Sequence, residues 1–65
     1  MKNNVKKFRI EQSLTQQELA NHIGITRQTI GLIEKGEYNP SLQLCINIAL
    51  ILGKGLDELF MEEII

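Results

Sequence analysis

The sequence predicts an all-α domain built from five short helices. Apolar residues recur at the three- and four-residue spacing of a helix along most of the chain. Residues that favour helix starts precede three of these segments, and glycines that favour helix ends follow two of them. The sequence has no linker, internal repeat or low-complexity stretch, so we expect a single domain over residues 1–65.

The first helix is expected over residues 4–12. Val5 and Phe8 occupy its inward positions, and its basic residues face outward. The segment "SLT" then breaks the helical pattern before the second helix begins.

Capping residues define the second and third helices. Thr15 is followed three residues later by Glu18, which is a capping box: each side chain accepts a hydrogen bond from the other residue's free amide. Gly24 ends this helix in the left-handed conformation. The third helix starts at Thr26, another N-cap type, and runs to Lys35, the residue before the stop at Gly36.

The fourth and fifth helices follow the loop "EYNP", which Pro40 keeps out of the helical conformation. Ser41 caps a helix over residues 42–52. A short fifth helix covers residues 56–61, with a weakly marked start because Gly55 stands where Ser or Thr normally caps. The final "MEEII" contains no stop signal, so it either frays or forms a short strand.

Residues 15–35 have the spacing of a helix-turn-helix. Apolar residues at inward positions anchor both helices in the core: Leu19, Ile23, Ile30 and Ile33. Ala20 is small where the helices cross, Gly24 supplies the positive φ of the turn, and Ile25 plugs the turn from below. In such a unit the second helix projects from the domain and fits a DNA major groove.

The sequence "LTQQELANHIGITRQTIGLIEKGEYNPSLQLCINIALILG", followed by "LDELF", resembles the Cro/C1-type (Xre-type) helix-turn-helix regulators of phage and bacteria. The resemblance covers essentially the whole chain and implies the five-helix, lambda-repressor-like DNA-binding fold. It is particularly close to short members such as the cytolysin repressor type of Gram-positive bacteria. In that type the two chain ends pair into a small sheet, which "MKNNV" and "FMEEII" would form here.

The expected base-contacting residues lie at the start of the third helix: Thr26, Arg27, Gln28 and Thr29. Arg27 can donate two hydrogen bonds to guanine, and Gln28 can bond adenine in a bidentate manner. The alternative is that Arg27 contacts only phosphate or solvent.

Gly31 lowers the stability of a helix by about 1 kcal/mol relative to Ala at the same interior position. Its bare backbone either lets the helix approach the bases closely or reflects neutral drift.

The expected phosphate-contacting residues are spread over several segments: Gln16, Lys35, Tyr38, Asn39, Lys6 and Arg9. Gln16 starts the second helix, where side chain and free amides can hold a phosphate. Arg9 has a second interpretation. The resemblance implies that it pairs with Glu34 and ties the first helix to the third.

The helix over residues 42–52 is apolar nearly all round, which suggests two buried faces. One would pack on the core, and the other, with the C-terminal segment, would pair two subunits. The alternative is that so small a domain simply buries its longest helix on every side.

Charge is distributed unevenly along the chain. Residues 1–35 hold six basic and three acidic residues, whereas residues 36–65 hold one basic and five acidic residues. The basic half can therefore face DNA although the net charge is −1.

These features favour a sequence-specific DNA-binding transcriptional regulator, a dimeric repressor that places residues 26–35 in the major groove of a near-palindromic operator. The alternative is an antitoxin-like or adaptor module that uses the same fold to bind protein. Cys45 and His22 are the only Cys and His, so no metal or disulfide is expected. No catalytic constellation, cofactor motif, small-molecule site, signal peptide or membrane segment is evident, and the expected location is the cytoplasm.

Overall fold

A computed structural model describes residues 2–64 of the chain, and the side chains of residues 2–60. The described residues form five helices and no strand, which confirms the all-α fold. The helices are α1 (Val5–Glu11), α2 (Gln16–Ile23), α3 (Arg27–Glu34), α4 (Leu42–Leu52) and α5 (Leu56–Ile64). None of them is long and apolar enough to cross a membrane.

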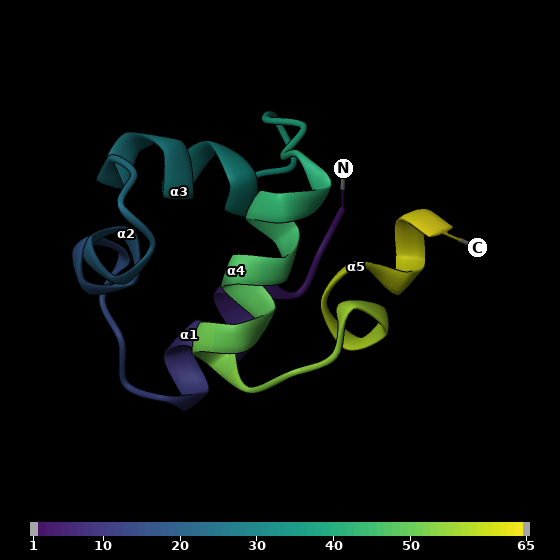
Figure 1. The fold of residues 1–65 in the computed structure, drawn as a ribbon, viewed down its shortest axis with the longest axis horizontal. Helices are drawn as coiled ribbons and strands as arrows, with labels where there is room; N and C mark the ends of the chain where they lie inside the picture. The colour runs from purple at the N-terminus through teal and green to yellow at the C-terminus, as the bar shows by residue number, and fades with distance from the viewer. Residues whose placement is uncertain (1, 65) are drawn as a thin grey trace.

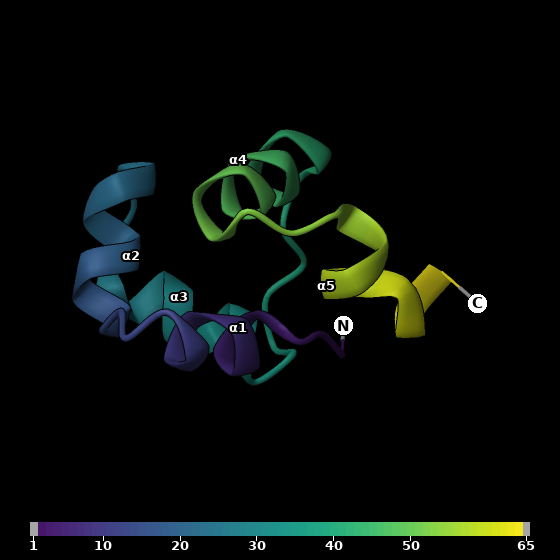
Figure 2. The same cartoon turned by 90° about the horizontal axis from the view of Figure 1, so that it is seen from below.

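The helices are arranged along a body of 30 × 21 × 19 Å. Helices α2 and α3 lie at one end of the long axis and α5 at the other, with α1 and α4 between them (Figures 1 and 2). Because α3 packs against both α1 and α2, its inner face is fixed from two sides while its outer face stays open.

All five helices contribute to one core. The largest fully buried side chains are Val5, Leu19, Ile30, Ile33, Ile48, Leu52 and Leu59. The predicted inward positions of α2 and α3 are therefore buried, except that Ile23 is only partly covered. Phe8 is also only partly buried, and the Lys54 ammonium lies 4.9 Å from its ring centroid. A cation at that distance can be attracted to the ring face.

The predicted N-caps are present. The Thr15 hydroxyl accepts from the Glu18 amide at 3.0 Å, and Glu18 Oε1 accepts from the Thr15 amide at 2.9 Å. Hydrogen bonds from the Thr15 backbone, and then from its side chain, hold the pKa of the Glu18 carboxyl below its usual value. The hydroxyls of Thr26 and Ser41 cap α3 and α4 by accepting from the backbone amides of Thr29 and Leu44, at 3.2 Å each.

The sheet expected from the chain ends is not formed by the described residues, since residues 60–64 belong to α5. Helix α5 therefore extends past its predicted end at Met61, and residue 65 lies outside the described part. The chain ends still meet, through a different set of bonds. The Asn4 amide donates to the Leu59 carbonyl at 2.9 Å, and Asn4 Nδ2 donates to the Glu58 carbonyl at 2.9 Å. Burial of Leu59 and Phe60 on one helical face favours the helix over a strand.

Candidate nucleic-acid interface

A left-handed glycine fixes the angle between α2 and α3. Gly24 has φ +88° and donates its N–H to the Ala20 carbonyl at 2.8 Å, and Ile25 donates to the same carbonyl at 3.1 Å. Ala20 is completely buried, and Ile25 packs against the core below the turn. Because the turn is closed by two backbone bonds and plugged from below, α3 is held rigidly with its outer face exposed.

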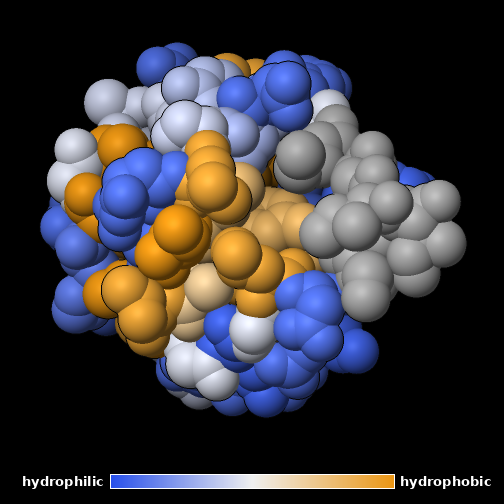
Figure 3. Space-filling model, turned by 45° about the vertical axis from the view of Figure 1, so that its right-hand side comes forward, coloured by the Kyte–Doolittle hydropathy of each residue, from blue (hydrophilic) through white to orange (hydrophobic). Residues whose placement is uncertain are grey.

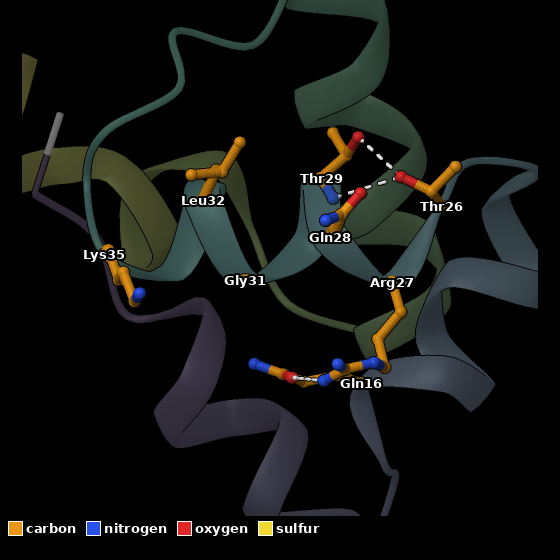
Figure 4. A pocket seen from close by; sticks show the side chains of 8 residues that line it. All are labelled: Gln16, Thr26, Arg27, Gln28, Thr29, Gly31, Leu32 and Lys35. Atoms are coloured by element: carbon orange, nitrogen blue, oxygen red, sulfur yellow. Dashed lines mark hydrogen bonds between the residues drawn. The ribbon is translucent and has the colours of Figure 1, made fainter.

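The outer face of α3 borders a shallow hollow of about 520 Å³ (Figure 4). Its lining consists of Gln16, Thr26, Arg27, Gln28, Thr29, Gly31, Leu32 and Lys35. The four residues predicted to contact bases therefore lie together with two of the predicted phosphate-contacting residues, Gln16 and Lys35. Helix α3 and its two cap residues supply seven of these eight residues, and α2 supplies Gln16.

The side chains at the start of α3 differ in their availability. Thr26 and Thr29 bond to each other through their hydroxyls at 2.9 Å, and the Thr26 oxygen also caps the helix. Gln28 is exposed, and its amide has no hydrogen-bond partner among the described residues. Arg27 is exposed as well, but one of its nitrogens donates to Gln16 Oε1 at 3.1 Å. Gln28 and the remaining Arg27 donors are therefore the groups best able to bond an incoming ligand.

Behind the hollow, Gln16 connects Arg27 to a buried ion pair. Gln16 Nε2 donates to Glu34 Oε1 at 3.0 Å. The other Glu34 oxygen accepts from Arg9 Nε at 2.6 Å, and Arg9 Nη1 donates to the Leu14 carbonyl at 2.7 Å. Arg9 is only 8% exposed, so its guanidinium ties α1 to α3 and is not presented to a phosphate.

Gly31 and Leu32 form the bare and apolar part of the hollow (Figure 4). A Cβ atom built on Gly31 would meet only Gln16 Nε2, at 3.8 Å, which is ordinary contact. Packing within the chain therefore does not require glycine here. Leu32 is 39% exposed, and we did not predict it as a site residue. Its position four residues after Gln28 and three before Lys35 places it on their face, and this signal was available in the sequence.

The remaining predicted phosphate contacts lie away from the hollow. Tyr38 and Asn39 are exposed in the loop between α3 and α4, and Lys6 is exposed on α1. None of the three lines the hollow. The structure thus gathers six of the ten predicted DNA-contacting residues in one place and leaves these three outside it, with Arg9 behind it in the core.

A separate apolar surface covers the outer side of α4. Hydrophobic side chains gather in the middle of the face shown in Figure 3. Leu42 and Leu50 are exposed, the latter by 74%, and Leu50 borders a hollow of about 320 Å³ that also includes Ile46, Ala49 and Leu56. The only polar pair on the helix is Gln43 and Asn47, which bond to each other at 3.0 Å. Helix α4 therefore buries one face in the core and presents a second apolar face to solvent.

Comparison with known proteins agrees with this architecture. Residues 5–59 match the family described as Helix-turn-helix. An uncharacterised HTH-type transcriptional regulator of Methanocaldococcus jannaschii, MJ0272, is 46% identical over 63 residues, which cover 97% of this chain and 96% of that protein. The cryptic phage CTXphi transcriptional repressor RstR of Vibrio cholerae is 33% identical over 89% of this chain and 52% of its own length.

A solved structure shows the same fold. The restriction-modification controller protein C.AhdI of Aeromonas hydrophila superposes with a TM-score of 0.78 at 30% identity, over 83% of this chain and 82% of that one. The family match covers most of the chain, and the matched residues include every helix that forms the turn, the hollow and the buried ion pair. The chain therefore belongs to the helix-turn-helix family of transcriptional regulators, of the Cro/C1 (Xre) type.

Proposed function

We propose that this protein is a sequence-specific DNA-binding repressor that acts as a dimer in the cytoplasm. The observation that carries the proposal is the hollow in front of α3, where Arg27 and Gln28 present free hydrogen-bonding groups beside a bare Gly31. An α-helix with such side chains at its N-terminal end fits the major groove of B-DNA.

Arg27 and Gln28 read bases in this proposal. A guanidinium has five N–H donors, so Arg27 can keep its bond to Gln16 and still donate two hydrogen bonds to guanine. The free amide of Gln28 suits the bidentate edge of adenine. Each such contact discriminates against a wrong base by about 1–3 kcal/mol.

Phosphate contacts position α3 in the groove. Lys35 lines the hollow, and Lys6, Tyr38 and Asn39 are exposed outside it. The backbone amide of Gln16, the first residue of α2, has no partner within its own helix and can donate to a phosphate oxygen. Because so few cations contribute, affinity for DNA is modest and falls with added salt. The logarithm of the association constant falls with the logarithm of the salt concentration, with a slope of about −0.9 for each phosphate neutralised.

The exposed face of α4 pairs two subunits. Leu42 and Leu50 are large apolar residues exposed on this face, with Ile46 between them in the same row of residues four apart. A twofold axis through such a patch makes the same surface serve both partners, and it places two recognition helices on one side of DNA. Near-palindromic operators follow from that symmetry, with half-sites about 34 Å apart.

Selection of bound sequences from random DNA tests the proposal. We expect a near-palindrome with half-sites one helical turn apart. In mobility-shift titrations on that sequence, Arg27→Ala and Gln28→Ala each relax one base position. Gln17→Ala is the matched control, because this exposed glutamine on α2 bonds only Asn21, at 2.8 Å, and does not line the hollow. Unchanged base preference in both α3 variants would show that α3 does not read the sequence, and would favour a protein-binding module instead.

A further inference from the structure

Glu34 lies behind the hollow, and its side chain is only 4% exposed, so it cannot touch a base itself. Its two oxygens have different partners. Oε2 accepts from Arg9 Nε at 2.6 Å, while Oε1 accepts from Gln16 Nε2 at 3.0 Å and from Arg9 Nη2 at 3.3 Å. The carboxylate therefore serves the helix-tying ion pair and also contacts the residue that holds Arg27.

The position of Gln16 between these groups leaves its amide one satisfactory orientation. An ionised carboxylate only accepts hydrogen bonds, and a guanidinium only donates them. The Gln16 NH₂ group must therefore point to Glu34, and its oxygen must point to Arg27, which is the arrangement observed. Figure 4 shows the bond between Gln16 and Arg27. Turning the amide over would set donor against donor and acceptor against acceptor.

We infer that Glu34 is a positioning residue that sets the base preference at Arg27 by fixing the orientation of the Gln16 amide. An exposed arginine loses much rotamer freedom when it binds. A bond that already holds it before DNA arrives reduces that cost and restricts the direction of its remaining donors. This inference rests on the proposed reading of a base by Arg27.

Replacing Glu34 by glutamine, its neutral isostere, tests whether the direction of these hydrogen bonds, from Gln16 to Glu34 and from Arg27 to Gln16, matters for base reading. In Glu34→Gln, the oxygen of the new amide stays toward Arg9, so its NH₂ group faces Gln16. Gln16 then turns its oxygen to that group and presents its own NH₂ to Arg27, and the Arg27 bond is lost. We expect the ratio of dissociation constants for wrong and right base at the Arg27 position to fall about fivefold, a part of the discrimination that one arginine contact supplies.

Arg9→Lys is the matched control for stability. It weakens the same ion pair and removes donors to Glu34 and to the Leu14 carbonyl, but it leaves Glu34 an acceptor for Gln16. Both variants should melt at lower temperature, and both are assayed at a temperature at which circular dichroism shows them folded. Only Glu34→Gln should lower the discrimination ratio. An equal fall in both variants would mean that Glu34 acts through stability alone and would overturn the inference.

A second pair of variants tests the Gln16 link, without which Glu34 cannot act on Arg27, even if Glu34→Gln does not fold. Gln16→Met keeps the side-chain length but removes both bonds, and Gln17→Met is its neighbouring control. We expect the same loss of discrimination in Gln16→Met, absent in Gln17→Met, and no further loss when Gln16→Met is added to Arg27→Ala. A uniform loss of affinity over all sequences would instead identify Gln16 as a phosphate contact only.

The failure of this inference can be told from the failure of base reading. If Arg27→Ala relaxes one base position but Gln16→Met and folded Glu34→Gln keep the wild-type ratio, the positioning role alone is wrong. If Arg27→Ala relaxes no position, direct reading by Arg27 is wrong, and the inference about Glu34 falls with it.

Discussion

Gly31→Ala should raise the stability of the free protein while weakening its complex with DNA. Gly31 lies inside α3 with helical backbone angles, and it has no positive φ that glycine alone would tolerate. Alanine is favoured over glycine by about 1 kcal/mol in a helix interior. The added methyl would meet only Gln16 Nε2, at 3.8 Å, so no steric cost offsets this gain.

For a domain of this size, about 1 kcal/mol corresponds to a rise of roughly 4–8 °C in the melting temperature. Thermal unfolding followed by circular dichroism measures it. Gly24→Ala is the control, because nothing lies within 4 Å of its added methyl and φ is +88°. It should lower stability by about 1–2 kcal/mol through backbone strain alone. A melting temperature for Gly31→Ala at or below that of wild type would refute the claim that the site is empty.

The second half of the prediction concerns the groove. If the bare backbone at Gly31 lets α3 approach the bases, the extra methyl should raise the operator dissociation constant about tenfold, which is about the energy of one mismatched base pair. Titration at fixed salt measures this constant. A stabilised variant that binds its operator as tightly as wild type would show that glycine here is not required for docking.

Three further predictions concern the exposed face of α4, the cap of α2 and the buried thiol of Cys45. Leu50→Lys places a charge on the exposed face of α4 and should shift sedimentation from dimer to monomer, whereas retention of the dimer would exclude this face. Thr15→Ala removes the α2 cap and should cost about 1 kcal/mol of unfolding free energy in urea titration. Because the Thr15 backbone N–H, which Thr15→Ala keeps, is the main cause of the lowered pKa of Glu18 in the folded state, the contribution of this carboxylate is present above pH 4.5 and is lost as pH falls through the folded pKa, so wild type and Thr15→Ala should both lose stability in acid. Burial raises the pKa of the Cys45 thiol above its ordinary 9.0, so the unfolded chain loses this proton first and stability should fall as pH rises past 9; Cys45→Ala should abolish that slope.

Local signals were sufficient to predict most of the fold. The starts of α2, α3 and α4 are marked in the sequence by the N-cap residues Thr15, Thr26 and Ser41. Capping needs only a side chain and a backbone amide two or three residues away, so it can be recognised locally. The fifth helix was predicted over residues 56–61, but its continuation to Ile64 was not. The helix is also held by packing of Leu59 and Phe60 in the core and by a bond from Asn4, far away in the sequence. Contacts between residues so far apart in the sequence cannot be predicted from local sequence patterns.

The same distinction applies to the site. Arg27 and Gln28 were predicted because the helix-turn-helix spacing fixes which end of α3 is exposed. The hydrogen bonds from Arg27 to Gln16 and from Gln16 to Glu34 join residues up to 18 positions apart on two helices. The spacing of apolar and polar residues in the sequence does not predict such bonds. The ion pair of Arg9 with Glu34 was expected from family resemblance alone, because spacing does not pair residues 25 positions apart.

The dimensions of the domain place a strict condition on the proposed dimer. Half-sites about 34 Å apart put each recognition helix about 17 Å from the twofold axis. The long dimension of the domain is 30 Å, and α3 lies toward the end opposite α5 (Figure 2). An axis at the exposed face of α4 thus lies within reach of that spacing without any linker. Because α4 packs on α1 and α2, and both of these helices pack on α3, a change of angle at the α4 face would move both recognition helices together. Variants at Leu50 that keep a dimer but repack it should therefore alter the preferred half-site spacing while leaving the bases read by Arg27 unchanged.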